Sequence, residues 1–358
     1  MNYWQMPMNT FEGTRMTLRL CMGVVGLLLL AAIQPATAAE YTLKIATVSP
    51  EGSYWMTRMR EGAGEIAERT ERRVQLKFYG GGVMGNDKKV LRKMRAGQLH
   101  GGTFTSGGLA ERDPDLQLYG LPLLFQTADE VRYVRDRMDS VLIKQLEEKT
   151  GLVSFGLASG GFARLMSNEP VRTLDDLRGQ KVWVPEGDGI SYAAMQALGL
   201  APVTLPITDV LTGLQTGLIE IIGSPAVGAV VLQWHTKVRY MSDLPVSYVY
   251  ATLVLDNRAF KRLSIGDQAI VRVVMEETYR EFDLVNDRDE AQAAEALAKA
   301  GIETIPVDQT QLPQWRELVG KVNREQAEKG AIDPGLLRTL QQHLQDFRTQ
   351  RHSADIAP

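Results

Sequence analysis

Residues 162–225 read FARLMSNEPVRTLDDLRGQKVWVPEGDGISYAAMQALGLAPVTLPITDVLTGLQTGLIEIIGSP. The run QKVWVPE (180–186) is typical of a strand, and a short helical segment that ends in ALGLAP (197–202) precedes a second strand. The next run, DVLTGLQTGLIE (209–220), has apolar residues at helical spacing. We interpret these two consecutive αβ units as one wall of a ligand-binding cleft, which the rest of the chain surrounds and closes.

Length and composition are those of an ordinary soluble globular protein with two domains. The 358 residues are 44% hydrophobic and 23% charged, with a net charge of -3. No polybasic patch is present, which argues against a nucleic-acid partner. The four histidines are scattered rather than at metal-ligand spacing, so we expect neither a metal nor a cofactor.

The first 39 residues have the pattern of a secretory signal peptide. A short basic start at Met16–Arg19 precedes the apolar run Gly23–Ile33, which is too short to span a bilayer comfortably. Small residues at 35–39 then offer a cleavage site, although an uncleaved anchor is the alternative. Either Met1 or Met16 is the start. Removal of this segment would also remove the lone Cys21 and deliver a cysteine-free protein to the periplasm.

The remaining chain predicts two α/β lobes joined by hinge strands. We expect a first lobe over 40–160, a second over 161–248, and a last part over 249–358 that completes the first lobe and packs on both. The crossing strands are expected at Thr150–Ser159 and Tyr248–Asp256. A long helix is predicted from Ile265 to about Ala300, opened by Ser264 and Asp267 as a capping box. Two lobes that close on a ligand are the architecture of a solute receptor.

The stretch Gly80–Gly85 (GGGVMG) satisfies the G-x-G-x-x-G pattern between an expected strand and helix. A dinucleotide site also needs an acidic residue roughly 20 positions on, where this chain reads GGTFTSGG. We therefore favour a tight βα turn that faces the cleft. No nucleophile elbow or nucleophile–base pair points to an enzyme.

Several blocks together resemble the DctP-type substrate-binding subunit of TRAP (tripartite ATP-independent periplasmic) transporters. They are YTLKIAT, GGGVMGNDKKVLRKMRAGQL, LPLLF, ARLMSNEPVRTLDDLRGQKVWVPEG, ALGLAPVTLPITDVLTGLQTGLIE and LVLDNRAFKRLS, and they cover essentially the whole chain after the signal peptide. The resemblance implies a type II periplasmic-binding-protein-like fold with a long helix across both lobes. It also implies a receptor, not an enzyme, that delivers a solute, most often a carboxylate, to a membrane permease pair.

The chain departs from the family pattern at pocket positions. Gly179, Lys181 and Pro185 of the family's G-x-K-x-R-x-P block are in register, but Trp183 stands where the carboxylate-binding arginine should be. Ser224 stands in place of an asparagine, and Val48 in place of a polar residue. These changes predict a cavity that is less polar than one for a small dicarboxylate.

By this resemblance, Arg164 matches an earlier family arginine and would anchor an anionic group, while Trp183 stacks on the apolar part of the solute. The other expected ligand-binding residues are Ser224, Thr105, Ser106, Val48, Tyr54, Glu186 and Pro206. Tyr54 and Trp55 fit equally well in the first turn of a helix. The structural alternative places Trp183 in the core and pairs Arg164 with Glu186 or Asp188. For Trp234 and His235 we expect core or hinge packing.

The main hypothesis is thus a receptor for an organic acid with a less polar body. Two alternatives stay open from the sequence. The first is a receptor for an uncharged lipophilic molecule, with an additional helper protein in the transport system. The second is a receptor that presents its ligand to a sensor kinase or chemoreceptor.

Overall fold

The computed structural model describes residues 41–356, so the predicted signal peptide and both possible start methionines lie outside the described residues. Within the described part, no helix is both long and apolar enough to cross a membrane. The description below concerns this part alone.

The first lobe is a parallel sheet covered by helices. Its strands are β1 (Tyr41–Ala46), β2 (Val74–Tyr79) and β3 (Gly101–Thr105), and its helices are α2 (Tyr54–Arg69), α3 (Asp87–Arg95) and the short α4 (Ser106–Leu109). β1 lies between β2 and β3 and pairs in parallel with both. Buried residues of β1, β2 and α2 form one core cluster, and residues of α3 and β3 form another on the sheet.

The predicted glycine turn connects β2 to α3. Gly81, Gly82 and Gly85 have φ angles of 61°, 70° and 101°, a region that favours glycine. A Cβ on Gly82 would lie 2.9 Å from Cγ2 of Thr208, which belongs to the other lobe. The turn is therefore tight and faces the second lobe.

Two antiparallel strands join the lobes. β5 (Ala158–Ser167) pairs with β10 (Ser247–Asp256), and the register shifts between Val249 and Tyr250. The first crossing strand was predicted at Thr150–Ser159, which is wrong. That run holds the short β4 (Leu152–Ser154) and only the start of β5, because Gly156 between them has a φ of 122° and interrupts the strand.

The second lobe has strands on both sides of β8 (Ile221–Ser224). β6 (Lys181–Pro185) pairs in parallel with β7 (Ala201–Leu205) and with β8, while β8 pairs antiparallel with β5. β5 also pairs with β9 (Tyr240–Ser242), which pairs with β11 (Glu303–Ile305). Helices α6 (Gly189–Ala197), α7 (Val210–Thr216) and α8 (Ala226–Val231) complete the lobe, with short 3₁₀ turns at Asp175–Leu177, Ile207–Asp209 and Trp234–Lys237. The main path of hydrogen-bonded strands runs β2-β1-β3-β10-β5-β8-β6-β7 through both lobes.

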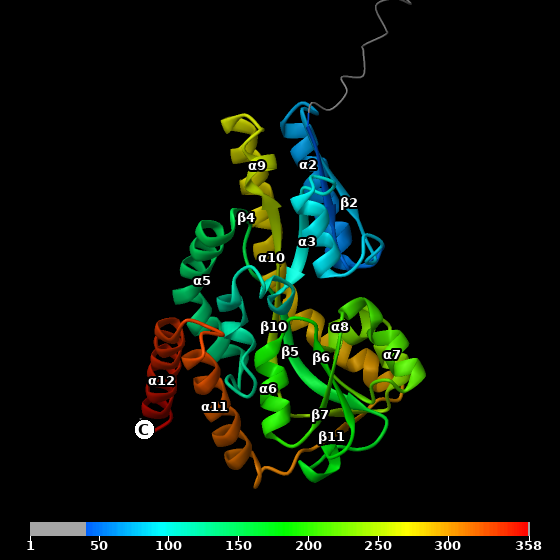
Figure 1. Ribbon diagram of the computed structural model, residues 1–358, viewed down its shortest axis with the longest axis vertical. Helices are drawn as coiled ribbons and strands as arrows, with labels where there is room; N and C mark the ends of the chain where they lie inside the picture. The colour runs from blue at the N-terminus through cyan, green and yellow to red at the C-terminus, as the bar shows by residue number, and fades with distance from the viewer. Residues whose placement is uncertain (1–40, 357–358) are drawn as a thin grey trace, which may run out of the picture. The chain divides into compact units, whose positions relative to one another are not determined.

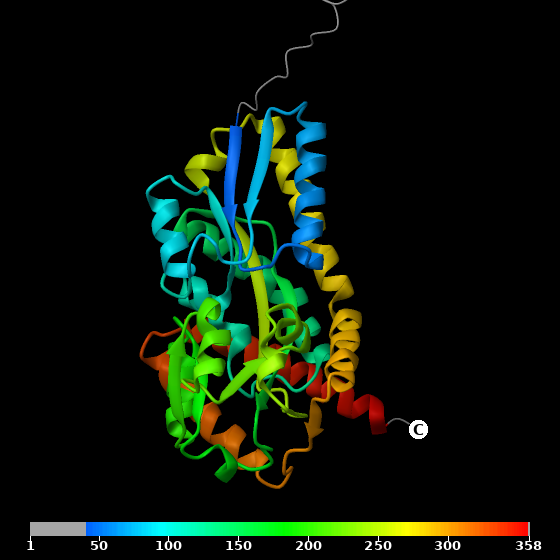
Figure 2. The same ribbon diagram turned by 90° about the vertical axis from the view of Figure 1, so that its right-hand side faces the viewer.

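The long helix α10 (Ile265–Lys299) follows the short α9 (Asn257–Phe260) and contributes to both lobes (Figure 2). The hydroxyl of Ser264 accepts from the Asp267 N–H at 3.1 Å, which confirms the predicted start of this helix. Val274 and Phe282 pack in the core of the first lobe, whereas Ala293 and Leu297 pack in that of the second. The two-lobed α/β fold with a long shared helix is therefore as predicted.

The remaining long helices, α5 (Ala128–Thr150), α11 (Leu312–Glu328) and α12 (Pro334–Ile356), lie on the left of the view in Figure 1. α5 packs against the C-terminal helix α12, and α11 packs against α6. A 3₁₀ segment at Pro114–Gly120 leads into α5, and its Tyr119 packs edge-on against Tyr250 of β10.

Candidate ligand-binding site

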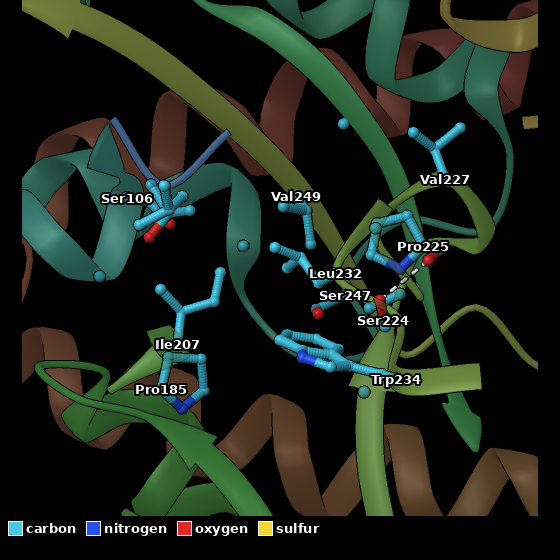
Figure 3. Close-up of a pocket in the computed structure, with 18 of the residues that line it drawn as sticks. Ser106, Pro185, Ile207, Ser224, Pro225, Val227, Leu232, Trp234, Ser247 and Val249 are labelled. Atoms are coloured by element: carbon cyan, nitrogen blue, oxygen red, sulfur yellow. Dashed lines mark hydrogen bonds between the residues drawn. The ribbon is translucent and has the colours of Figure 1, made fainter. Parts of the chain in front are cut away.

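A cavity of about 300 Å³ lies between the lobes, which we call the central cavity. Its lining comes from the loop after β1, from α2, α3, α4, α6, α8 and α10, and from β3, β5, β6, β8 and β10. Figure 3 shows Ser106 and Ile207 on one side of it, and Ser224, Ser247 and Trp234 on the other. The volume is at the lower end of the range for small-molecule sites, which is roughly 300–1,000 Å³.

Most of the residues that the sequence singled out line this cavity. They are Val48, Tyr54, Thr105, Ser106, Trp183, Glu186, Pro206 and Ser224. Tyr54 and Trp55 satisfy both interpretations, because they form the first turn of α2 and also line the cavity. Their roles toward a ligand stay predictions.

Arg164 does not line the cavity, which contradicts its expected place as the anchor of a carboxylate. Its neighbours on β5, Ala163 and Leu165, are lining residues, and side chains alternate between the two faces of a strand. The Arg164 guanidinium instead donates to the backbone carbonyl of Asp243. Neither Glu186 nor Asp188 is its hydrogen-bond partner in the described structure, so these two acids are wrong as partners. The acid that lies close enough to interact with its charge is Glu290 of α10.

Trp183 belongs to the core and to the cavity wall at once. It is 7% exposed, and its indole N–H donates to the Leu205 carbonyl at 2.9 Å. Its ring packs edge-on against Trp234, with 5.3 Å between the ring centroids. The N–H is therefore already used, and what Trp183 offers a solute is apolar surface.

Trp234 also lines the cavity, while His235 bonds through Nδ1 to the Ala229 carbonyl at 3.0 Å. The expectation of core packing thus holds for Trp234, which is 3% exposed, but the residue borders the cavity as well.

The hydroxyls that line the cavity differ in whether they already make a hydrogen bond within the protein. Ser224 is buried and donates to the Pro225 carbonyl at 2.8 Å. Thr105 precedes α4 without capping it, and neither its side chain nor that of Ser106 has a hydrogen bond to the described residues. Thr105 and Ser106 remain available to a ligand.

The charged side chains that line the cavity are all acidic. They are Asp87, Glu186, Asp188 and Asp289, and no lysine, arginine or histidine is among the described lining residues. Burial, together with the nearby charge of Glu186, raises the pKa of Asp87 to about 6. Burial also raises the pKa of Asp188 above its usual value. The sequence predicted the loss of one arginine from the cavity but not this acidic character.

Asn286 of α10 is a further lining residue that the sequence analysis missed. Asn286 is only 8% exposed, and its side chain has no hydrogen-bond partner within residues 41–353. An asparagine amide can donate two hydrogen bonds and accept two. The amide atoms are open to the cavity rather than sealed in the core, so they can bond a ligand there.

The lobes touch at one rim of the cavity, which we call the rim contact (Asn86, Lys88, Gly107, Glu186 and Gly187). Glu186 accepts from Asn86 Nδ2 at 3.0 Å and pairs with Lys88 Nζ at 3.3 Å, so both bonds join α3 to the loop after β6. A Cβ on Gly187 would lie 2.4 Å from the Gly107 carbonyl oxygen, so the two backbones are in direct contact. These contacts form only when the lobes are closed on each other.

Comparison with known proteins decides the family. The model of DctP, the bacterial extracellular solute-binding protein family 7, matches residues 45–329. The chain belongs to this family. The membership confirms the DctP-type resemblance, and family 7 consists of solute-binding proteins rather than enzymes.

The similar proteins differ in how much of their length aligns with this chain. The C4-dicarboxylate-binding periplasmic protein DctP of Rhodobacter capsulatus is 22% identical over 327 residues, which cover 88% of this chain and 95% of that protein. A solute-binding protein of Chromohalobacter salexigens is 28% identical over 159 residues, covering 44% of this chain. The chain spans about half of that relative, 47% of its length.

Solved structures of TRAP periplasmic solute-binding proteins share the fold. A TRAP periplasmic solute-binding protein from Desulfovibrio salexigens, with bound orotic acid, has a TM-score of 0.78 at 18% identity, covering 86% of this chain and 99% of its own. Another from Xanthobacter autotrophicus, with bound β-D-galacturonate, has a TM-score of 0.76 at 22% identity, covering 84% and 99%. At this identity the likeness concerns the fold alone.

Proposed function

We propose that the chain is the solute receptor of a TRAP transporter and that its solute is an organic acid with a largely apolar body. It would be exported by a cleaved signal peptide, bind the solute in the periplasm and hand it to membrane permease subunits. Family membership and the two-lobed fold support the receptor role. The observation that carries the choice of solute is the central cavity, which is lined by Trp183, Trp234 and Phe282 and has no basic side chain among its described lining residues.

The solved relatives named above hold organic acids, which favours the same broad class here. A small dicarboxylate carries two charges, and such charges are usually held by arginine pairs in a dry site. The central cavity offers a carboxylate only neutral donors, such as Asn286, Thr105 and Ser106. An acid with one carboxylate and a larger apolar part therefore fits better than succinate.

The direct test is to express the full chain in a bacterium and purify the exported protein without added ligand. Mass spectrometry of the intact protein gives its N-terminus, which we expect near Glu40. Denaturation then releases any bound solute, which mass spectrometry identifies. A mono-acid with an aromatic or aliphatic body supports the proposal, and a dicarboxylate or sugar acid contradicts it.

A binding assay provides an independent measurement. We expect thermal unfolding to shift upward with aromatic or branched aliphatic acids and much less with succinate or galacturonate, because a ligand stabilises the folded protein in proportion to its affinity. A larger shift with succinate than with any apolar mono-acid would contradict the proposed solute, while leaving the receptor role intact.

A further inference from the structure

The acidic lining of the central cavity contains one carboxylate that has no ion pair and no hydrogen bond in the described structure. Asp87 is the first residue of α3, whose N-terminus is already capped by Asn86. The Asp87 carboxylate lies over Gly108, where an added Cβ would be 2.4 Å from Oδ2. It has no hydrogen bond or ion pair to any residue from 41 to 353, although it lines the cavity.

The charged groups around Asp87 do not compensate it. Lys88, the next residue on α3, turns to Glu111 at 3.2 Å and to Glu186 at 3.3 Å. From the second lobe, Glu186 adds a like charge, and Asp188 lies against Gly107, next to the glycine that Asp87 covers. A half-buried carboxylate without an ion pair is stabilised by a positive charge that arrives with the ligand.

Asn286 is the second unsatisfied group of the cavity and is independent of the acidic residues. It is more than nine-tenths buried, lines the cavity and makes no hydrogen bond to the described residues. Its neutral amide can donate to a ligand carboxylate without contributing a charge. The cavity thus combines a free acceptor of positive charge with a free neutral donor, and apolar faces such as those of Trp183 and Phe282 also line it.

From this combination we propose that the solute is zwitterionic: an organic acid that also carries a protonated amine, with Asp87 accepting from the ammonium group and Asn286 donating to the carboxylate. The inference rests on the receptor function proposed above and narrows its solute. A zwitterion brings no net charge into an acidic cavity, whereas a simple acid would meet only like charges there.

The experiment uses probes that differ only in their charged groups. Phenylalanine is compared with 3-phenylpropionate, which lacks the amine, and with phenethylamine, which lacks the carboxylate. Leucine, 4-methylpentanoate and 3-methylbutylamine form a second set with an aliphatic body. Isothermal titration calorimetry on the exported protein, freed of bound solute by unfolding and refolding, gives each dissociation constant at pH 7.5.

We expect at least one amino acid to bind about tenfold or more tightly than both of its partners, which corresponds to losing one charge-assisted hydrogen bond. In Asp87→Asn, a change that keeps the side-chain shape, the preference for the amino acid over its deaminated acid should disappear. Equal or tighter binding of the deaminated acid by the unaltered protein would overturn the inference, as would the absence of binding by either amino acid.

The pH dependence gives a second readout that needs no variant. Asp87 must be ionised to attract the ammonium group, and its pKa is about 6, so amino-acid affinity should fall as the pH drops from 7 to 5. A flat profile over that range would overturn the role of Asp87. If the deaminated acids bind tightly instead, the receptor function stands and only the zwitterion is lost. If solutes of every class fail to bind, the receptor function falls as well.

Discussion

At the scale of single residues, the guanidinium of Arg135 is the most heavily bonded charge beneath the hinge strands. It is 8% exposed and donates to Asp139 and Asp283 at 2.8 Å each and to the Tyr248 hydroxyl at 3.2 Å. Asp283 in turn accepts from the backbone N–H of Ser159 on β5. One arginine therefore ties α5 and α10 to both hinge strands.

Replacing Arg135 with alanine should lower the free energy of unfolding by about 3–5 kcal/mol, because it leaves two carboxylates without their buried partner. Arg132→Ala is the matched control on the same helix, since the ion pairs of Arg132 are largely exposed and contribute about 0–1 kcal/mol. Urea denaturation followed by circular dichroism measures both. Equal transition midpoints for the two variants would refute the structural role.

Arg164 leads to the opposite prediction, because its side chain lies outside the cavity. Arg164→Ala should change the dissociation constant of the solute by no more than about twofold, since its guanidinium bonds the Asp243 carbonyl and is not among the groups that line the cavity. The variant should instead be less stable, because it loses the hydrogen bond to the Asp243 carbonyl. Calorimetric titration with the co-purified solute measures the affinity, and a loss of binding would restore the arginine as an anchor.

Arg164 also shows where prediction from sequence ends. Val48, Thr105 and Ser106 line the cavity because each lies at or just after the carboxyl end of a strand of an α/β lobe, where ligands bind. Which face of β5 carries Arg164 depends on register, and a shift by one residue exchanges the two faces. Asn286 left no signal, since it lies in a strongly charged helix whose pattern resembles a solvent-exposed surface.

At the scale of elements, α3 and the loop after β6 are joined by a bond between Lys88 and Glu186. Lys88 is half exposed and reaches two carboxylates, Glu186 across the rim contact and Glu111 within its own lobe. A partly exposed pair of this kind is weak and sensitive to salt. We expect the pair of Lys88 and Glu186 to slow the separation of the lobes.

Glu186→Gln should accelerate solute release by roughly two- to fivefold at low salt, which corresponds to a loss of about 0.5–1 kcal/mol. The effect should vanish at high salt because the charges are then screened. Glu111→Gln is the matched control, as it removes the other partner of Lys88 without affecting the contact between lobes. Stopped-flow fluorescence of the cavity tryptophans records the rates. The same acceleration in both variants would argue against the rim contact.

Helices and strands were predicted correctly where a single sequence pattern marked them, and wrongly where two patterns conflicted. Ser264 and Asp267 set the start of α10 because a capping hydroxyl has few other uses at that position. The run Thr150–Ser159 is apolar almost throughout and looked like one strand, yet Gly156 divides it. Periodicity alone does not distinguish one buried strand from two short ones.

At the scale of the whole molecule, the backbone contact between Gly107 and Gly187 sets how closely the lobes approach. Gly187 has a φ of 93°, and a side chain there would collide with the carbonyl oxygen of Gly107. The order of strands and the long helix predicted two lobes from the sequence. The sequence could not predict this contact, because it joins residues far apart in the chain that pair in no sheet.

Gly187→Ala should therefore hold the lobes apart and weaken solute binding by about tenfold or more, as strain of about 1–3 kcal/mol adds to the collision. Gly189→Ala is the control two residues away, where an added Cβ meets no atom within 4 Å. Calorimetry gives the affinities, and small-angle scattering with saturating solute reports whether the variant still contracts. An unchanged affinity for Gly187→Ala would show that closure does not depend on this approach.

The pairing of β5 with β10 has a consequence for how long a solute stays bound. These strands belong to the sheet path of both lobes and stay hydrogen-bonded to each other, and a register shift at Val249 marks where the ribbon already departs from regular pleating. Separation of the lobes then needs bending rather than the rupture of a ladder. The residence time of the solute is accordingly decided at the rim contact and in the central cavity rather than in the hinge ladder.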